Sequence, residues 1–198
     1  INVIIATGGT AMVRAAYSSG NPALGVGPGN AVAYVDPTAK VDAAARCLVD
    51  SKSFDNSVLC TNESVVVTLD SNRGNMERAL RSAGAHVCNE VDTNKLRDYL
   101  FGGEGFTLEA IGKSAQWIAE RAGIRVSPSA KILVPVVATP GQDDLLFREK
   151  LCPVLTSTAA VDFEQAVTFA KHTTKRGAGH SAAFHGNDTA RLLAFSQD

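Results

Sequence analysis

The sequence has no excess of charge of either sign and no long apolar run. Its 198 residues include 19 Lys and Arg against 20 Asp and Glu, a formal net charge of -1. Electrostatics therefore gives no reason to expect nucleic acid or an anionic membrane as partner. Gly, Pro or a charged residue interrupts every apolar stretch before the roughly 18 residues that a transmembrane helix needs. We predict a water-soluble protein that binds neither nucleic acid nor membrane.

Cysteines are few and form no recognisable metal-binding pattern. Cys47, Cys60, Cys88 and Cys152 include no CxxC pair, and no histidine lies near them at metal-ligand spacing. The pattern is typical of reduced thiols in a cytosolic protein and leaves one of them available as a nucleophile. We expect no bound metal.

An initiator methionine and a signal peptide are also missing. The chain opens at Ile1 inside an apolar, strand-like run that has no basic flank. We therefore expect a piece of a longer polypeptide. With 45% hydrophobic and 20% charged residues, the chain can still bury a core of its own.

Short β-rich runs alternate with helical patterns, which is typical of parallel strands joined by crossover helices. Most runs are apolar throughout, as expected when helices cover both faces of the sheet. The predicted strands are 1–6, 31–36, 64–69, 85–88, 131–137, 154–158 and 181–184. The predicted helices are 11–17, a helix after Asp36 and Pro37, and 73–83, 113–122, 162–171 and 188–195. We predict an α/β fold with a largely parallel sheet and helices on both faces.

Two local signals help to place these helices. Asp36 and Pro37 offer an N-cap and a first-turn proline for the helix that follows. Gly84 offers a C-terminal cap for the helix before it.

A glycine turn follows the first predicted strand. Gly8 and Gly9 lead from it into the first helix, and glycines at such a turn let an anion such as a pyrophosphate approach the backbone and the helix N-terminus. The full GxGxxG fingerprint is absent. An unliganded β-to-α turn is the alternative interpretation.

A polar segment, 53–61, carries Cys60 between a predicted helix and strand. A cysteine in such a connection can be partly exposed among backbone donors, which favours the thiolate. The alternative is a buried cysteine that acts as a small hydrophobic residue. Cys47, Cys88 and Cys152 are better explained by structural roles.

Two further residues are candidates for binding or catalysis. Glu149 comes just before Pro153 and a new strand; a carboxylate there can hold ribose hydroxyls, or it is simply a solvated charge. His180 suits an acid, a base or a ligand-orienting group near neutral pH. A structural histidine is the alternative.

Taken in order, these segments resemble the aldehyde dehydrogenase superfamily, specifically its CoA-acylating branch. That branch includes the aldehyde dehydrogenase half of bifunctional aldehyde-alcohol dehydrogenases and the propionaldehyde and acetaldehyde dehydrogenases of bacterial microcompartments. The matching segments are ATGG at 6–9, AYSSG at 16–20, GVGPGN at 25–30, SFDN at 53–56, Cys60, EKLCP at 149–153 and GAGH at 177–180. The ordered set covers essentially the whole chain.

The resemblance implies a role for each candidate residue. Cys60 is implied as the nucleophile, whose thiolate attacks an aldehyde to give a thiohemiacetal and, after hydride transfer to NAD or NADP, a thioester. Its backbone N–H is implied as an oxyanion donor. Glu149 matches the position that holds the nicotinamide ribose, and Gly8 and Gly9 match the turn beside the cofactor. Asn56 and His180 are candidates to line the site.

One departure from the hydrolytic members of the superfamily concerns the acyl acceptor. Those enzymes carry a glutamate in a Glu-Leu-Gly-Gly segment that activates water, and Gly25 stands at that position here. A glycine cannot act as a general base, so we expect coenzyme A to accept the acyl group as co-substrate. The alternatives are a non-acylating aldehyde or semialdehyde dehydrogenase and a non-catalytic α/β module of a multidomain protein.

The resemblance also implies an organisation. Residues 1–29 match the C-terminal part of the NAD(P)-binding domain, and residues 30–198 match the catalytic domain, truncated at its C-terminus, in the three-layer fold of the superfamily. The expected substrate is a small aldehyde. We expect a homo-oligomer in the cytoplasm, or in a bacterial microcompartment.

Overall fold

The computed structural model describes residues 2–27, 29–103, 105–137, 144–175 and 181–197, and its centre is a five-stranded parallel sheet of order β7-β8-β4-β3-β9. Its strands are β3 (Val32–Val35), β4 (Val65–Leu69), β7 (Val136–Val137), β8 (Thr156–Ala160) and β9 (Ala182–His185). Two further parallel pairs join β1 (Ile4–Thr7) to β2 (Ala23–Val26) and β5 (Ala85–Val87) to β6 (Ile132–Val134). The helices are α1 (Thr10–Tyr17), α2 (Val41–Ser53), α3 (Arg73–Ser82), α4 (Glu90–Phe101), α5 (Ala115–Arg121), α6 (Phe163–Lys175) and α7 (Thr189–Gln197).

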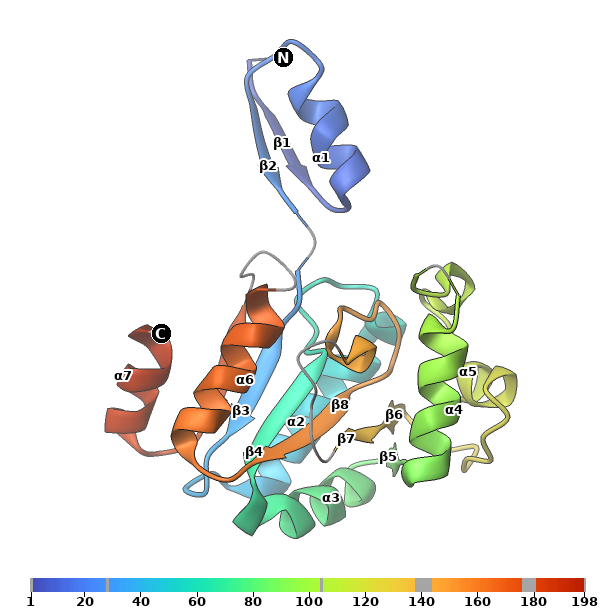
Figure 1. The fold of residues 1–198 in the computed structure, drawn as a ribbon, viewed down its shortest axis with the longest axis vertical. Helices are drawn as coiled ribbons and strands as arrows, with labels where there is room; N and C mark the ends of the chain where they lie inside the picture. Colours follow the sequence, from blue (N-terminus) through green and yellow to red (C-terminus); the bar gives the residue numbers. More distant parts are fainter. Residues whose placement is uncertain (1, 28, 104, 138–143, 176–180, 198) are drawn as a thin grey trace.

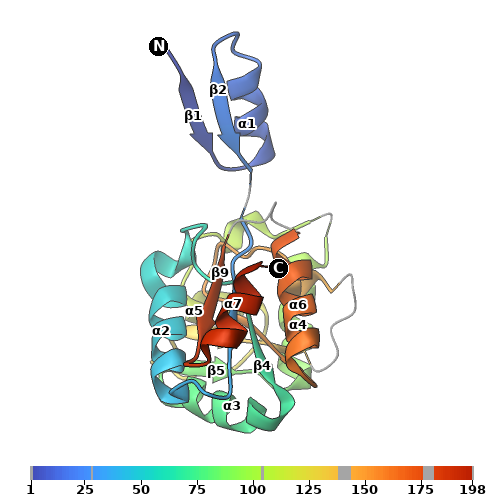
Figure 2. The same cartoon turned by 90° about the vertical axis from the view of Figure 1, so that its left-hand side faces the viewer.

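Helices cover both faces of the central sheet, and alternate strand residues feed two separate cores. On one face Ala33 and Val35 pack with buried side chains of α2 and α3. On the other, Val32 and Tyr34 pack with α4, α5 and α6. Figure 2 shows α2 and α6 on opposite sides of the sheet. The predicted α/β fold, its parallel sheet and its two helical layers are confirmed.

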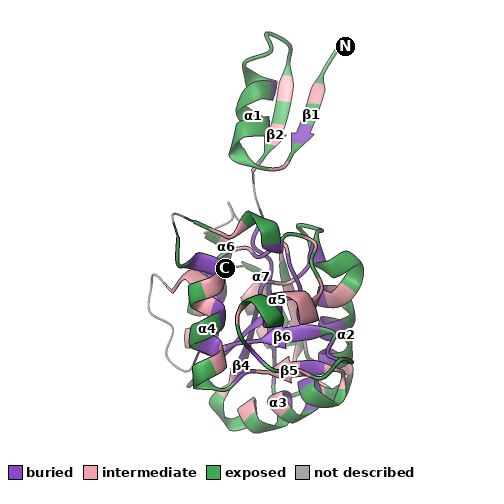
Figure 3. Ribbon diagram, turned by 90° about the vertical axis from the view of Figure 1, so that its right-hand side faces the viewer, coloured by how far each residue is buried: buried purple, intermediate pink, exposed green. Residues whose placement is uncertain are grey.

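The unit formed by β1, α1 and β2 lies outside the five-stranded sheet (Figure 1). Within residues 2–27 only Ala6 and Ala16 are buried, and Figure 3 shows most of the unit in the colour of exposed residues. Ile5 and Leu24 are 73% and 64% exposed. The unit therefore presents apolar strand residues that nothing in the described part of the chain covers.

The predicted elements match the observed ones with three differences. Pro135 separates β6 from β7 where one strand was expected over 131–137, because proline donates no ladder hydrogen bond. The prediction missed β2 and α4. Asn89 caps the N-terminus of α4, because its side chain accepts a hydrogen bond from the Asp92 N–H. Among the described residues, no helix has the length and the apolar character that crossing a membrane requires.

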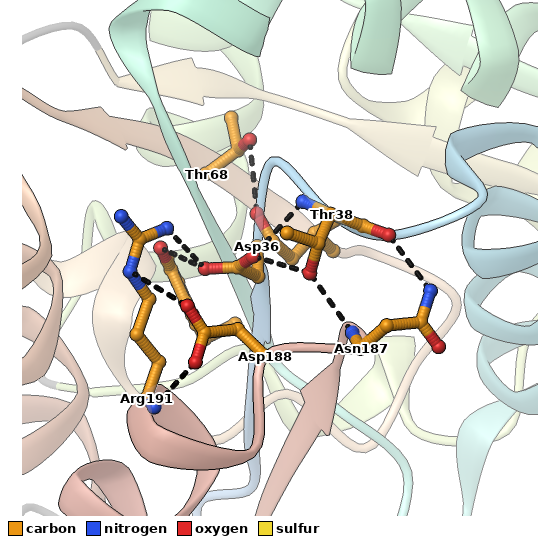
Figure 4. A network of polar contacts seen from close by, with 8 residues as sticks. Asp36, Thr38, Thr68, Asn187, Asp188 and Arg191 are labelled. Carbon is orange, nitrogen blue, oxygen red and sulfur yellow. Dashed lines mark hydrogen bonds and ion pairs between the residues drawn. The ribbon is translucent and has the colours of Figure 1, made fainter.

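The expected C-cap at Gly84 is confirmed, but the expected N-cap at Asp36 is wrong. Gly84 has φ +106° and its N–H donates to the Arg81 carbonyl. Helix α2 begins only at Val41, and the buried Asp36 carboxylate has another role (Figure 4).

Asp36 joins the carboxyl end of β3 to α7. Its Oδ1 accepts from the Thr38 backbone N–H (2.9 Å) and hydroxyl (2.6 Å), and its Oδ2 accepts from Arg191 (2.9 Å) and the Tyr34 hydroxyl (3.2 Å). Asn187 closes the network with two hydrogen bonds to Thr38. Burial alone would raise the pKa of Asp36, but the hydrogen bonds from Thr38 and Arg191 hold it below its usual value.

The turn after α2 contains three consecutive residues with positive φ. Asp55, Asn56 and Ser57 have φ of 48°, 48° and 62°. Asp and Asn tolerate this left-handed conformation because their short polar side chains can bond locally, but serine does so poorly. Ser57 is also fully buried, and its hydroxyl meets no hydrogen-bond partner among the described residues. The turn is therefore strained at Ser57.

Replacing Asp36 should test the network in Figure 4. Asp36→Ala leaves Thr38 and Arg191 without their shared buried acceptor, so we expect the free energy of unfolding to fall by about 3 kcal/mol at pH 7. Because the folded-state pKa is lowered, this contribution is present above the ordinary aspartate pKa of about 4 and is lost as the pH falls through the folded-state pKa. Urea unfolding at several pH values measures both effects. As a control, Asp42→Ala breaks an exposed ion pair with Arg78 and should cost less than about 1 kcal/mol; equal losses would contradict the network's role.

Relieving the strain at Ser57 should stabilise the chain. Ser57→Gly removes the left-handed penalty and an unpaired buried hydroxyl, so we expect the free energy of unfolding to rise by about 1 kcal/mol. The matched control is Ser53→Gly, because Ser53 has a helical φ of -86° and glycine there should lower stability by about 0.5 to 1 kcal/mol. Thermal unfolding of both variants gives the comparison. A loss of stability in Ser57→Gly would show that the turn is not strained at this position.

Candidate active site

The strands β3, β4 and β8 begin at one edge of the central sheet, and this edge brings the candidate residues together. The Ser64 N–H donates to the Ala31 carbonyl (2.8 Å), and the Thr156 N–H donates to the Ser64 carbonyl (3.0 Å). The segments that precede these strands therefore lie side by side. They carry Cys60, before β4, and Glu149, before β8.

Cys60 is exposed on the turn that leads to β4. Asn62 fixes this turn, because its side chain donates to the carbonyls of Ser51 (2.8 Å) and Phe54 (3.4 Å), and its N–H donates to the Leu59 carbonyl. The Cys60 N–H meets no acceptor among the described residues. Cys60 is thus an exposed cysteine whose backbone N–H is left unused by the fold in the described part of the chain.

The other cysteines differ from Cys60 in their surroundings. Cys88 and Cys152 are buried, and burial raises the pKa of their thiols to about 12 and about 11. Both are therefore protonated and shielded. Cys47 lies on α2 and is exposed, so it is the useful comparison for Cys60.

Glu149 is half-buried between two residues of opposite exposure. Arg148 is exposed, whereas Lys150 is 1% exposed. A second lysine, Lys52 from the last turn of α2, is completely buried and donates to the Lys150 carbonyl (3.0 Å). Burial lowers the pKa of Lys52 to about 8 and lowers that of Lys150 well below its usual value.

Asn56 links the Cys60 turn (residues 54–62) to the Glu149 segment (residues 146–151) through the loop that contains Gly112. Its side-chain N–H donates to the Gly112 carbonyl (3.0 Å), and the Gly112 N–H donates to the Leu151 carbonyl (3.1 Å). Gly112 has φ +68°, and a Cβ there would lie 3.1 Å from Val58 of the Cys60 turn. The two segments are therefore held together on this side as well.

The predicted glycine turn lies in the separate β1–α1–β2 unit. Gly8 has φ +144° and donates to the Val26 carbonyl (3.2 Å). No atom lies within 4 Å of the place a Cβ would take at Gly9, so the backbone there is open to a ligand. Figure 1 shows the carboxyl ends of β1 and β2 directed toward the body that holds the central sheet.

The predicted site residues therefore fall into three groups. Cys60, Asn56 and Glu149 share one sheet edge, and Gly8 and Gly9 belong to the neighbouring unit. His180 lies outside the described residues, so it stays a prediction. No group of His, Cys, Asp or Glu that could hold a metal ion occurs in the described ranges.

Lys52, Lys150 and Asn30 were not predicted from the sequence. Asn30 is buried before β3 and donates to the Phe147 carbonyl (2.7 Å) and the Thr173 carbonyl (2.8 Å). A signal existed for Lys52, because it follows Leu48 and Val49 on the apolar stripe of α2. A lysine on such a stripe has to find a buried hydrogen-bond acceptor.

Curated proteins with similar sequences are named aldehyde-alcohol dehydrogenases and aldehyde dehydrogenases, one of them acetylating, although no model of a known protein family matches the chain. The chain is 38% identical over 200 residues to aldehyde-alcohol dehydrogenase 2 of Entamoeba histolytica. The match covers 96% of the chain and 23% of that protein. It is also 38% identical over 193 residues to the acetylating succinate-semialdehyde dehydrogenase of Clostridium kluyveri, covering 96% of the chain and 43% of the relative. The chain thus spans less than half of either relative.

Solved structures give the same result for the fold. An acetylating aldehyde dehydrogenase from Geobacillus thermoglucosidasius matches with a TM-score of 0.94 and 33% identity, over 100% of this chain and 44% of that one. A propionaldehyde dehydrogenase from Rhodopseudomonas palustris with bound propionyl-CoA matches with a TM-score of 0.90 and 28% identity, over 100% and 43%.

The described fold, the exposed Cys60 and these similarities over essentially the full chain agree with the resemblance found in the sequence. The chain belongs to the aldehyde dehydrogenase superfamily, in its CoA-acylating branch.

Proposed function

We propose that the chain forms the catalytic part of a CoA-acylating aldehyde dehydrogenase, which converts an aldehyde, CoA and NAD(P)+ into acyl-CoA, NAD(P)H and a proton. The observation that carries this proposal is the exposed Cys60 on a segment that precedes β4, next to the segment that carries Glu149 before the neighbouring strand β8. An aldehyde-alcohol dehydrogenase and an acetylating succinate-semialdehyde dehydrogenase match the chain over nearly its full length. The substrate is a small aldehyde.

Cys60 supplies the nucleophile. Its thiolate adds to the aldehyde carbon, and the carbonyl oxygen gains negative charge that the Cys60 N–H can stabilise. Loss of hydride from that carbon leaves an acyl group on Sγ as a thioester. The CoA thiolate then attacks the acyl carbon, and the Cys60 thiolate leaves. The N–H supports this role because it meets no acceptor among the described residues.

The residues fit a nicotinamide cofactor, which supplies the hydride acceptor when it is bound. Glu149 is half-buried on the segment that enters β8, and its carboxylate can accept hydrogen bonds from ribose hydroxyls there. The open backbone at Gly9, next to Gly8, accommodates the cofactor's close approach. Asn56 and His180 are proposed to line the site, with Asn56 acting through its bond to Gly112.

The acceptor is proposed to be CoA because Gly25 occupies the position of the hydrolytic base. The structure gives this glycine a packing role too. A Cβ at Gly25 would lie 2.5 Å from Val13 and 2.9 Å from Tyr17 of α1, and the Tyr17 hydroxyl accepts a hydrogen bond from the Gly25 N–H (2.9 Å). The close approach of α1 to β2 supports a site without a carboxylate at this position.

We further propose that residues 1–29 belong to the NAD(P)-binding domain and residues 30–198 to the catalytic domain. The separation of the β1–α1–β2 unit from the five-stranded sheet supports this division. A homo-oligomer is supported by exposed apolar side chains such as Leu192 and Leu193 on α7. Four free cysteines support the cytoplasm, or a bacterial microcompartment, as its location.

Removing the thiol of Cys60 should abolish activity. In the complete polypeptide that carries this chain, we expect Cys60→Ala to lower acyl-CoA formation by at least about 1000-fold, because no other group forms the thioester. Cys47→Ala removes the other exposed thiol and should leave the rate within about twofold. Iodoacetamide labelling followed by peptide mass spectrometry should modify Cys60 first. Equal, slow labelling of both exposed cysteines would favour a non-catalytic module.

Oxidation of the aldehyde should depend on CoA. A positioned general base contributes about 100-fold or more to rate, so without one at Gly25 we expect release of free acid in the absence of CoA to be at least about 100-fold slower than acyl-CoA formation in its presence. Steady-state NAD(P)H production with and without CoA, with product analysis, measures this ratio. Equal rates of free-acid formation without CoA would show that the enzyme is hydrolytic.

A further inference from the structure

Buried side chains hold the backbone on both sides of Glu149. Four backbone carbonyls in residues 146–150 accept hydrogen bonds from side chains, in addition to any backbone hydrogen bonds of helices or strands. These bonds are Lys150 Nζ to Leu146 O and Arg148 O (2.9 Å), Thr156 Oγ1 to Leu146 O (2.7 Å), Asn30 Nδ2 to Phe147 O (2.7 Å) and Lys52 Nζ to Lys150 O (3.0 Å). The carbonyls of both neighbours of Glu149 therefore accept hydrogen bonds from lysine Nζ groups.

Burial of two of these donors, the lysine side chains, costs free energy because they lose their hydration. Lys52 and Lys150 are 0% and 1% exposed, and neither takes part in an ion pair among those of the described residues. An apolar side chain of similar volume usually stabilises a core more than a buried charge does. Packing alone therefore does not explain two lysines here, whereas the need to hold an irregular backbone does.

Lys52 also connects the Glu149 segment to the Cys60 turn. It belongs to the last turn of α2, which leads directly into the Phe54–Ser57 turn and Cys60. Its Nζ donates to the carbonyl of Lys150, a residue 98 positions later in the sequence. A single side chain thus ties the helix that positions Cys60 to the backbone that positions Glu149.

We propose that Lys52 is a positioning residue for cofactor binding: its hydrogen bond to the Lys150 carbonyl sets the place of Glu149 relative to Cys60. The inference rests on the proposed function, because it takes Glu149 as the ligand of the nicotinamide ribose. Lys150 has the companion role, because its ammonium group fixes the Arg148 carbonyl on the other side of Glu149. Neither lysine needs to touch substrate or cofactor.

A double-mutant cycle in the complete polypeptide tests this role. Lys52→Met keeps the length of the side chain and removes the donor, and Glu149→Gln removes the carboxylate. We expect each to raise the KM for NAD(P)+ by about tenfold while kcat falls less than about threefold. Because Lys52 acts through Glu149, the double variant should have the KM of Glu149→Gln alone. Lys40→Met is the matched control, since Lys40 is an exposed lysine just before the same helix, and it should leave KM unchanged.

Three results would overturn the inference. Independent roles would make the two increases in KM multiply in the double variant. A purely structural role would lower kcat in Lys52→Met through a smaller active fraction and leave KM unchanged. An unchanged KM and kcat would exclude any role. If Lys52→Met does not fold by thermal unfolding, Lys52→Gln replaces it, because its amide is too short to reach the Lys150 carbonyl. A wild-type enzyme without CoA-dependent activity would instead refute the proposed function.

Discussion

Burial of the central sheet on both faces is the constraint on which the rest of the structure depends. Val32, Tyr34 and Val67 face one helical layer, and Ala33 and Val66 face the other. A buried polar group between these layers must find a partner, as Thr158 does by donating to the Val137 carbonyl (2.8 Å). Other polar side chains collect where the strands begin or end. These polar side chains and the reactive ones are therefore found at the two edges of the sheet where strands begin or end, and not on its apolar faces.

The two edges differ in what their polar groups do. At the carboxyl edge, Asp36 is saturated by Thr38, Arg191 and Tyr34, which close the edge under α7 (Figure 4). Ligands of open parallel sheets usually bind at this edge. Here the exposed Cys60 lies at the amino edge instead, where long connections enter β4 and β8. The candidate site is built from connections that buried donors make rigid.

The sequence predicted the elements that this burial controls and missed those that it does not. Strands such as β3 and β4 are continuous apolar runs, so composition alone locates them. Strand β2 is half-exposed and contains Gly25, and α4 has a polar first turn, so neither produces a clear pattern. Cys60 and Glu149 were candidates from their places before predicted strands, and their roles came from the resemblance to a family. The roles of Asp36 and Lys52 depend on partners 155 and 98 residues away, which no local pattern contains.

Gly25 shows how the lack of a catalytic group can be built into packing. In a strand, a glycine usually weakens the element, and one that persists often marks a close approach of backbone to another element. Here the close approach is to α1, whose Val13 and Tyr17 side chains fill the space that a Cβ would take. The Tyr17 hydroxyl also bonds the Gly25 N–H. Installing a glutamate at Gly25 would therefore force the Val13 and Tyr17 side chains of α1 to move. A larger side chain at this position would therefore need compensating changes at Val13 or Tyr17 to keep the contact between α1 and β2.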